Sequence, residues 1–147
     1  MNNPIANKFE KVFIFEGEYS NGKAINGISY DYIKNKEYKL IQGKGTILKY
    51  GENGRIKSQI NYVNENGEGK GSEFDGNGNL IFEGNYLDNY TNGFGKKYNN
   101  FGKLIFEGEY KNWQKSGHGK EYNHEGKLIF EGEYLNGEKM EKEKNII

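Results

Sequence analysis

Apolar and polar residues alternate with a period of two along several short stretches of the chain. Over 104–110, apolar residues or Gly occupy the even positions, and glutamates occupy most of the odd ones. Successive side chains of a β-strand point to opposite faces, so this pattern predicts a strand with one apolar and one solvated face. A loop through Asn112 and Lys115 then leads to a second predicted strand at 119–122. The stretch therefore predicts a β-hairpin.

The predicted hairpin recurs with a period of 24 residues. A signature of Phe, Glu, Gly, Glu or Asn, and Tyr occupies 82–86, 106–110 and 130–134. Glycines of the second predicted strand keep the same spacing, at Gly69 and Gly71, Gly93 and Gly95, and Gly117 and Gly119. A fixed period of this length is typical of repeat proteins, in which each unit stacks on its neighbours. Four units are expected from about Arg55 onward, with a diverged first unit and a shortened last one.

The N-terminal third is less regular. Residues 15–19 repeat the signature, but 31–50 break the period, and we expect one or two degenerate hairpins there. The expected organisation is a polar N-terminal segment at 1–12, degenerate hairpin repeats at 13–54, regular repeats at 55–137 and a polar C-terminal tail at 138–147.

An isolated two-stranded hairpin is only marginally stable, so these units must gain stability by pairing edge to edge. The predicted fold class is therefore all-β, an elongated single-layer antiparallel meander of repeated hairpins. Glycine weakens a strand interior, which makes Gly108 in the middle of a predicted strand notable. We expect such glycines to leave room for a neighbouring aromatic ring or for close approach of another backbone.

Composition narrows the possible function classes. The 147 residues include 21 Lys plus Arg and 21 Asp plus Glu, so the formal net charge is zero, which excludes a globally basic nucleic-acid binder. There is no Cys, and thiolate catalysis and Cys-based zinc sites are thereby excluded. The first 12 residues lack an apolar core of signal-peptide length, and we expect a soluble, cytoplasmic protein.

Sequence motifs for catalysis or cofactor binding are lacking. The glycines at 67–72 do not fit a phosphate-binding loop, and 75–79 lack the Gly and Glu that a calcium loop requires. His118 and His124 occur in one unit only, so we interpret them as surface turn residues. The glutamates of the signature fall on the solvated face. We therefore expect no enzyme activity, no cofactor and no metal site.

The repeat resembles the MORN family, whose pattern places Tyr-x-Gly-x-Trp before a His-Gly-x-Gly segment. Residues 106–110 followed by 116–119 match that spacing, with Phe and Tyr as the two aromatic residues and Ser116 at the position of the family's His. The resemblance is specific over 55–134 and loose over 13–54. It implies an elongated, twisted sheet and a non-enzymatic role in scaffolding, dimerisation or docking of proteins. Phospholipid binding is also attributed to the family, and a bacterial branch includes antitoxins or immunity proteins.

These expectations favour a repeat-based protein–protein interaction module. It would act as a scaffold, or as an immunity or antitoxin protein that binds and neutralises a toxin, so the partner is a toxin or a second copy of the chain. The alternative is a membrane-surface adaptor that binds phospholipid. Residues 102–125 contain four Lys and four Glu, and this neutrality disfavours both nucleic acid and anionic lipid.

One hairpin-loop position is a candidate for partner binding. The aligned units place Glu65, Asn89, Trp113 and Gly137 there, and Trp113 is the sole Trp of the chain. Because Tyr90 follows Asn89, we expect two large rings along one edge, about 10 Å apart by strand spacing. The alternative is that Trp113 folds over its own hairpin. The candidate partner-binding residues are Phe82, Tyr86, Tyr90, Phe106, Tyr110, Trp113, Phe130 and Tyr134.

Overall fold

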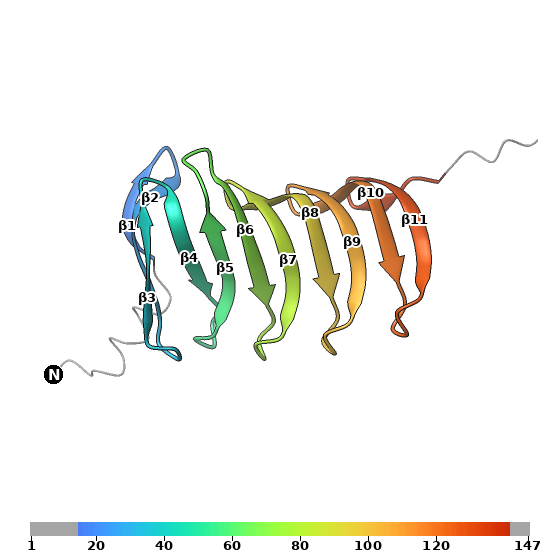
Figure 1. Cartoon of the computed structure of the whole chain (residues 1–147), viewed down its shortest axis with the longest axis horizontal. Coiled ribbons are helices and arrows are strands. Elements are labelled where there is room, and N and C mark those ends of the chain that lie inside the picture. Colours follow the sequence, from blue (N-terminus) through green and yellow to red (C-terminus); the bar gives the residue numbers. More distant parts are fainter. Residues whose placement is uncertain (1–14, 142–147) are drawn as a thin grey trace, which may run out of the picture.

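The computed structural model describes residues 15–141 as one open sheet of 12 antiparallel strands in sequence order (Figure 1). The described part contains no helix, and hence none that could cross a membrane. The strands are β1 (Glu16–Ser20), β2 (Lys23–Asp31), β3 (Lys36–Ile41), β4 (Lys44–Tyr50), β5 (Ile56–Tyr62), β6 (Glu68–Phe74), β7 (Leu80–Leu87), β8 (Tyr90–Tyr98), β9 (Leu104–Lys111), β10 (Gln114–Tyr122), β11 (Leu128–Leu135) and β12 (Glu138–Lys139).

The predicted all-β meander of hairpins is confirmed, but two details of the hairpins were wrong. The second strand of the hairpin, β10, begins at Gln114 rather than at residue 119, so the loop shrinks to Asn112 and Trp113. The segment at 138–147, expected to be a polar tail, contains β12, which pairs with β11 through Tyr134 and Leu135. The polar segment predicted at 1–12 lies outside the described residues.

The turns form two rows, one at each end of the strands, and the two rows differ in turn type. The row that includes the β9–β10 and β11–β12 turns is here called the loop rim. Its two-residue turns have positive φ at both positions, for example 51° at Asn136 and 85° at Gly137. Type I′ turns have these angles and match the twist of a hairpin. In the opposite row, Asp75, Asn99 and Asn123 each accept hydrogen bonds from backbone N–H groups two and four residues later.

A row of glycines crosses the sheet from β6 to β11 on the face that carries the aromatic residues, here called the aromatic face. Directly paired residues in this row are Gly71, Gly84, Gly95, Gly108, Gly119 and Gly132. A Cβ atom added at Gly119 would lie 2.6 Å from Cε2 of Phe106, and one at Gly95 would lie 2.6 Å from Cζ of Phe82. The expectation that mid-strand glycines leave room for rings is confirmed.

The rings above the glycine row form a continuous ladder. Phe106 makes edge-to-face contacts with Tyr110 of its own strand, at 5.5 Å between centroids, and with Tyr134 of the next unit, at 5.4 Å. Phe82 repeats the pattern with Tyr86 and Tyr110, at 5.9 and 5.1 Å. Such contacts stabilise aromatic pairs beyond simple burial. The ladder is thus the core of this single-layer sheet.

The N-terminal hairpins approach the loop rim of the regular repeats. Lys23 Nζ lies 2.7 Å from Oδ1 of Asp88, and Lys49 Nζ donates to the side-chain oxygen of Asn89 at 2.7 Å. In Figure 1, β1, β2 and β3 overlap at one end, whereas β5 to β11 lie side by side. These two contacts join the first two hairpins to the β7–β8 turn.

Candidate functional site

Trp113 occupies the second position of a type I′ turn, where φ is 70°. The equivalent positions of the turns at Asn21, Gln42 and Asn136 are Gly, with φ between 76° and 85°. Glycine adopts this left-handed conformation freely, whereas a bulky side chain does so at a cost of about 1–3 kcal/mol. The turn therefore carries a large aromatic side chain at the place where local geometry favours none.

The Trp113 side chain reaches back over the preceding hairpin. Its ring lies 5.9 Å from that of Tyr86 and 6.1 Å from that of Tyr90, both edge to face. The expected ring separation of about 10 Å was too large, because the indole turns toward Tyr90. The alternative in which Trp113 covers its own hairpin is wrong, since its aromatic contacts belong to the neighbouring unit. Trp113 is 46% exposed and Tyr90 50% exposed, so the pair forms an aromatic patch on the loop rim.

The other candidate residues are mostly unavailable to a partner. Phe82, Tyr86, Phe106, Tyr110 and Tyr134 are all buried, and Phe130 is half-buried. All six are among the candidate partner-binding residues. The glycine row lets the rings lie close to the backbone and cover one another, so this part of the expectation is corrected. The structure places these six side chains in the core ladder, and only Tyr90 and Trp113 extend from it to the surface.

Tyrosine hydroxyls of the ladder donate to carboxylates at every second unit. Tyr86 donates to Glu73 at 2.7 Å, and Tyr134 donates to Glu121 at 2.6 Å. The equivalent acceptor for Tyr110 would be residue 97, which is Lys, and the Tyr110 hydroxyl has no partner among the described residues. Burial raises the pKa of all three tyrosines far above the ordinary value, so each stays protonated.

Lysine side chains lie over the aromatic rings near the C-terminal end of the aromatic face. Lys115 Nζ lies 4.3 Å from the centroid of Phe106 and 3.7 Å from Oε1 of Glu121. Lys139 Nζ lies 4.7 Å from the Phe130 centroid and 2.9 Å from Oε2 of Glu121. Cation–π contacts of this kind shield a ring from water while leaving the ammonium partly solvated. Both lysines therefore contact a ring and a carboxylate of the protein itself.

A pocket of about 420 Å³ lies between the first two hairpins and the β5–β6 and β7–β8 turns of the loop rim. Phe15, Ile47, Leu48 and Tyr62 form much of its apolar wall, and Lys23 and Asp88 also line it. Burial raises the pKa of Tyr62 to about 12. Both cations of the lining, Lys23 and Lys49, already bond to the Asp88–Asn89 turn. The pocket thus has apolar walls, and both of its lysines are already bonded to the β7–β8 turn.

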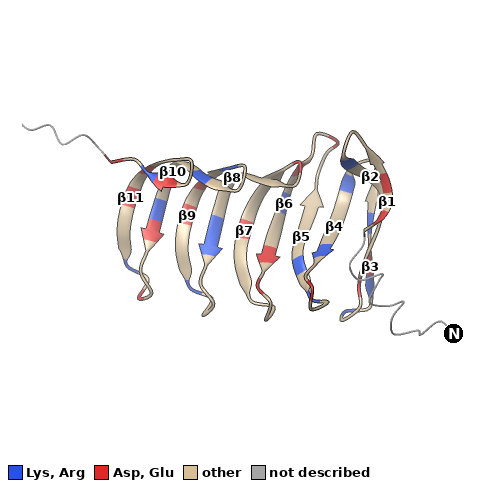
Figure 2. Ribbon diagram, turned by 180° about the vertical axis from the view of Figure 1, so that it is seen from behind, with Lys and Arg blue, Asp and Glu red and all other residues tan. Residues whose placement is uncertain are grey.

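The opposite, polar face carries a regular cross-strand row of charges. Directly paired residues from β7 to β11 are Glu83, Lys96, Glu107, Lys120 and Glu131 (Figure 2). The tyrosines that follow the row lysines on β8 and β10, Tyr98 and Tyr122, donate to the row carboxylates of the preceding strands, Glu83 at 2.6 Å and Glu107 at 2.7 Å. Opposite charges side by side stabilise a sheet only slightly, but they keep the face solvated.

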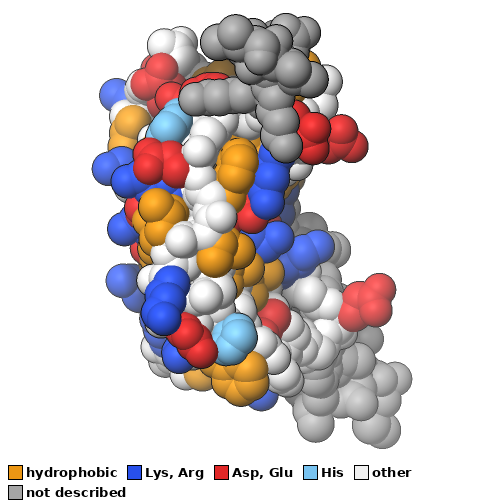
Figure 3. Space-filling model, turned by 90° about the vertical axis from the view of Figure 1, so that its right-hand side faces the viewer, with side chains coloured by type: hydrophobic (Ala, Val, Ile, Leu, Met, Phe, Trp, Pro, Cys, Tyr) orange, Lys and Arg blue, Asp and Glu red, His pale blue; other side chains and the backbone are white. Residues whose placement is uncertain are grey.

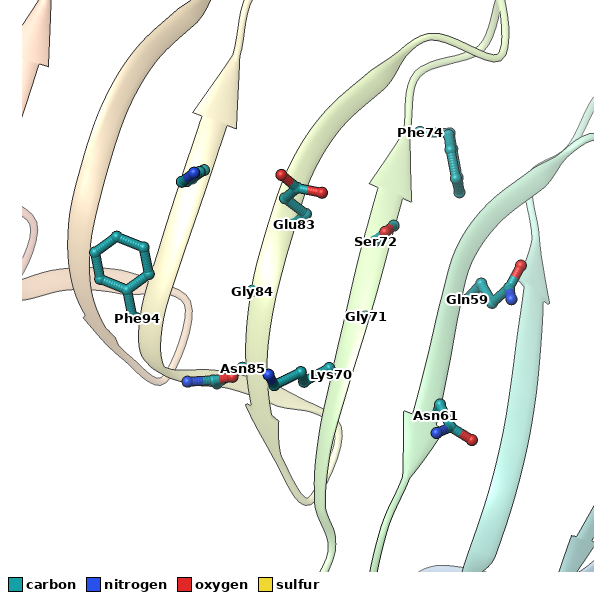
Figure 4. A pocket seen from close by; sticks show the side chains of 11 residues that line it. Gln59, Asn61, Lys70, Gly71, Ser72, Phe74, Glu83, Gly84, Asn85 and Phe94 are labelled. Carbon is teal, nitrogen blue, oxygen red and sulfur yellow. The ribbon is translucent and has the colours of Figure 1, made fainter.

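On β5 and β6 the row continues with the uncharged Gln59 and Ser72, and over β5–β8 the face is hollowed into a shallow cleft of about 470 Å³ (Figure 4). Its lining includes Gln59, Ser72, Phe74, Asn85, Phe94 and Lys96. Sequence reasoning did not single out this cleft. The available signal was a departure from the repeat, because Gln59 and Phe74 stand where later units have Glu and Tyr.

His118 lies within β10 rather than in a turn, which corrects its expected location. Its Nε2 is 2.9 Å from Oε2 of Glu131, and its Nδ1 is 3.4 Å from Oε1 of Glu133. Hydrogen bonding to Glu131 raises the pKa of this exposed histidine. Residues 15–141 contain no cluster of three or more side chains suited to hold a metal ion.

Neither the protein-family models nor the curated proteins that we compared with this chain give a match.

Proposed function

We propose that the chain is a non-enzymatic protein–protein interaction module with MORN-like repeats, whose partner docks on the loop rim at Trp113 and Tyr90. The observation that carries this proposal is the half-exposed Trp113 at a φ of 70°. Backbone strain persists where the surrounding structure or a function maintains it. Exposed Trp and Tyr side chains are enriched among the residues that dominate binding energy at interfaces.

The architecture supports such a role. Tyr86 is 2% exposed and belongs to the core ladder, so it provides a fixed support beneath the Trp113 ring. A rigid, amphipathic anchor loses little conformational entropy on binding. The rim pair therefore combines exposed apolar area with a preorganised base, which suits a folded protein partner such as a toxin that the module neutralises.

The scaffold version of this function uses a second copy of the chain, and the end of the sheet favours it. Among the described residues, only Tyr134, Leu135 and the carbonyl of Glu133 pair with the segment after β11. Within residues 15–141 nothing pairs with the rest of the outer edge of β11, and Leu128 and Ile129 are 51% and 60% exposed. Figure 3 views this end of the molecule and shows hydrophobic side chains among Lys and Glu. Open strand edges of this kind pair readily with another strand.

A phospholipid adaptor is the alternative function. An aromatic patch can enter the headgroup region of a membrane, but stable binding to anionic lipid needs free basic side chains beside it. Lys23 at the rim is paired with Asp88, and the exposed Lys111 beside the Trp113 turn is a single cation rather than a basic cluster. Protein docking is therefore the function we favour.

The test is affinity capture from the native organism, followed by mass spectrometry, with three baits. The wild type is compared with Trp113→Gly, which gives the turn the residue found in the turns at Asn21, Gln42 and Asn136, and with Phe101→Ala. Phe101 is 83% exposed in the opposite row of turns and serves as the matched control. A protein retained by the wild type and by Phe101→Ala, but lost from Trp113→Gly, supports docking on the rim. Equal capture by all three baits contradicts it.

A further inference from the structure

The cleft on the polar face lies where the repeat pattern is broken. In the two following units a tyrosine hydroxyl donates to a row carboxylate, Tyr98 to Glu83 and Tyr122 to Glu107. The corresponding pair in the cleft is Phe74 and Gln59. Phe74 has no hydroxyl to donate, and Gln59 carries no charge. No side-chain hydrogen bond to a described residue engages Gln59, so its amide donors and acceptor are free to meet a ligand.

The equivalent positions 61, 85, 109 and 133 on the polar face also change in the cleft. Asn61 and Asn85 line the cleft where Glu109 and Glu133 stand in the later units. Asn85 pairs directly with Lys70 across β6 and β7, and Figure 4 shows the two side chains beside each other. The cleft is therefore rich in amides, while the same face over β9–β11 is rich in carboxylates.

Aromatic rings flank these polar groups. Phe94 is 49% exposed, although the equivalent positions of its neighbours are polar, Lys70 and His118. In Figure 4, Phe94 and Phe74 stand on either side of Glu83 and Ser72. A half-exposed Phe on an otherwise polar strand face offers a flat apolar surface to a ligand.

The charges of the cleft favour an anion. Lys70 and Lys96 both line it, and neither forms an ion pair with a described carboxylate. The single carboxylate in the lining, Glu83, already accepts the hydroxyl of Tyr98. A ligand carboxylate would therefore meet the ammonium groups of Lys70 and Lys96, of which Lys96 also lies directly across from Glu83 and Glu107 on the neighbouring strands.

The strand pairing limits what kind of molecule can bind. The cleft spans β5 to β8, whose backbone groups are paired on both sides within the sheet. An extended peptide that binds by strand addition needs a free sheet edge. Recognition in the cleft must rely on side-chain amides, ammonium groups and ring faces, which suit a molecule with several hydroxyls and an apolar ring surface. The volume of about 470 Å³ is that of a small-ligand site.

The geometry points to a glycan-binding site in this cleft, for an oligosaccharide that contains uronic acid. The Phe94 ring on β8 would pack against the C–H face of one sugar ring. Gln59 on β5 and Asn85 on β7 would bond hydroxyls further along the oligosaccharide, and Lys70 and Lys96 would bind its carboxylates. This site lies on the face opposite the aromatic core and is independent of Trp113.

The test is calorimetric titration of the full chain with short oligogalacturonates. Neutral cello-oligosaccharides and an oligo-glutamate peptide are the comparison probes. We expect saturable binding of the oligogalacturonate that is weakened by added salt, about tenfold weaker in Phe94→Ala and unchanged in Phe101→Ala. The double variant Gln59→Glu with Phe74→Tyr recreates the pair of the sister units, so it should fold normally and lose the binding.

Several outcomes would overturn the inference. Absence of saturable oligogalacturonate binding is one. Equal binding of oligo-glutamate would indicate attraction by charge alone, and equal or tighter binding of the neutral sugar would contradict the role of the lysines. Binding that survives both Phe94→Ala and the double variant would place the sugar elsewhere. Trp113→Gly should leave sugar binding intact, which separates this test from that of the rim.

Discussion

The glycine row predicts a specific cost for adding one methyl group, at Gly119. The new Cβ would lie 2.6 Å from Cε2 and 2.7 Å from Cζ of Phe106, and 3.0 Å from Cε2 of Tyr134. Ordinary carbon–carbon contacts are about 3.5–4.0 Å, so the Phe106 ring would have to move by about 1 Å. That ring is 1% exposed and held between Tyr110 and Tyr134, which leaves it no free direction.

Overpacking of a filled core costs about 1–3 kcal/mol, and the trapped ring places Gly119→Ala in the upper part of that range. Alanine recovers about 0.4–1 kcal/mol by restricting the unfolded chain. The expected net loss of unfolding free energy is about 2 kcal/mol, or about 4–8 °C in melting temperature.

Urea and thermal unfolding followed by circular dichroism measure this loss. Gly76→Ala is the matched control, because a Cβ there meets only the side-chain nitrogen of Asn53 at 3.8 Å. We expect that control to stay within about 0.5 kcal/mol of the wild type. Equal stability of the Gly119→Ala and Gly76→Ala variants would refute the idea that the glycine row makes room for the ladder.

Three further predictions concern the aromatic face and the charge distribution. Tyr110→Phe should be neutral or slightly stabilising, because its hydroxyl is buried without a partner, whereas Tyr134→Phe should cost about 1 kcal/mol or more by breaking the bond to Glu121, both measured by urea unfolding. Burial alone would raise the pKa of Glu121, but hydrogen bonds from Tyr134 and Lys139 outweigh it and hold the pKa below its ordinary value. The melting temperature should therefore fall as pH drops below about 4.5 toward the folded-state pKa, and it should fall less in Glu121→Gln; parallel curves would contradict this. In liposome sedimentation at physiological salt, the protein should stay in the supernatant with anionic vesicles, and strong phosphoinositide-dependent pelleting would favour the adaptor function instead.

The repeat made much of the fold predictable. The period of 24 and the alternation over 104–110 predicted the meander of hairpins, and Gly108 in a strand predicted the room needed by a ring. Burial of the ladder was not predictable from one unit. It depends on strand register, which brings Tyr134 of one unit against Phe106 of the unit before it.

The candidate site was predictable only in part. Alignment of the units indicated that Trp113 replaces a glycine at a turn, and the φ of 70° agrees with that. Its direction toward Tyr86 and Tyr90 depends on the twist between hairpins, which no local pattern encodes. The cleft on the polar face was missed because Gln59 and Phe74 attract notice only beside the Glu–Tyr pairs of the sister units.

The binding constant of the captured partner, measured by calorimetry for the wild type and Trp113→Gly, tests the rim proposal most directly. Removing the indole relieves about 1–3 kcal/mol of backbone strain and forfeits ring contacts worth about 0.5–1.5 kcal/mol each. The melting temperature should therefore change little. Loss of a hot-spot side chain should weaken binding by about 2 kcal/mol or more, about 30-fold in Kd. A lowered melting temperature with an unchanged Kd would show instead that Trp113 is structural and that the partner binds elsewhere.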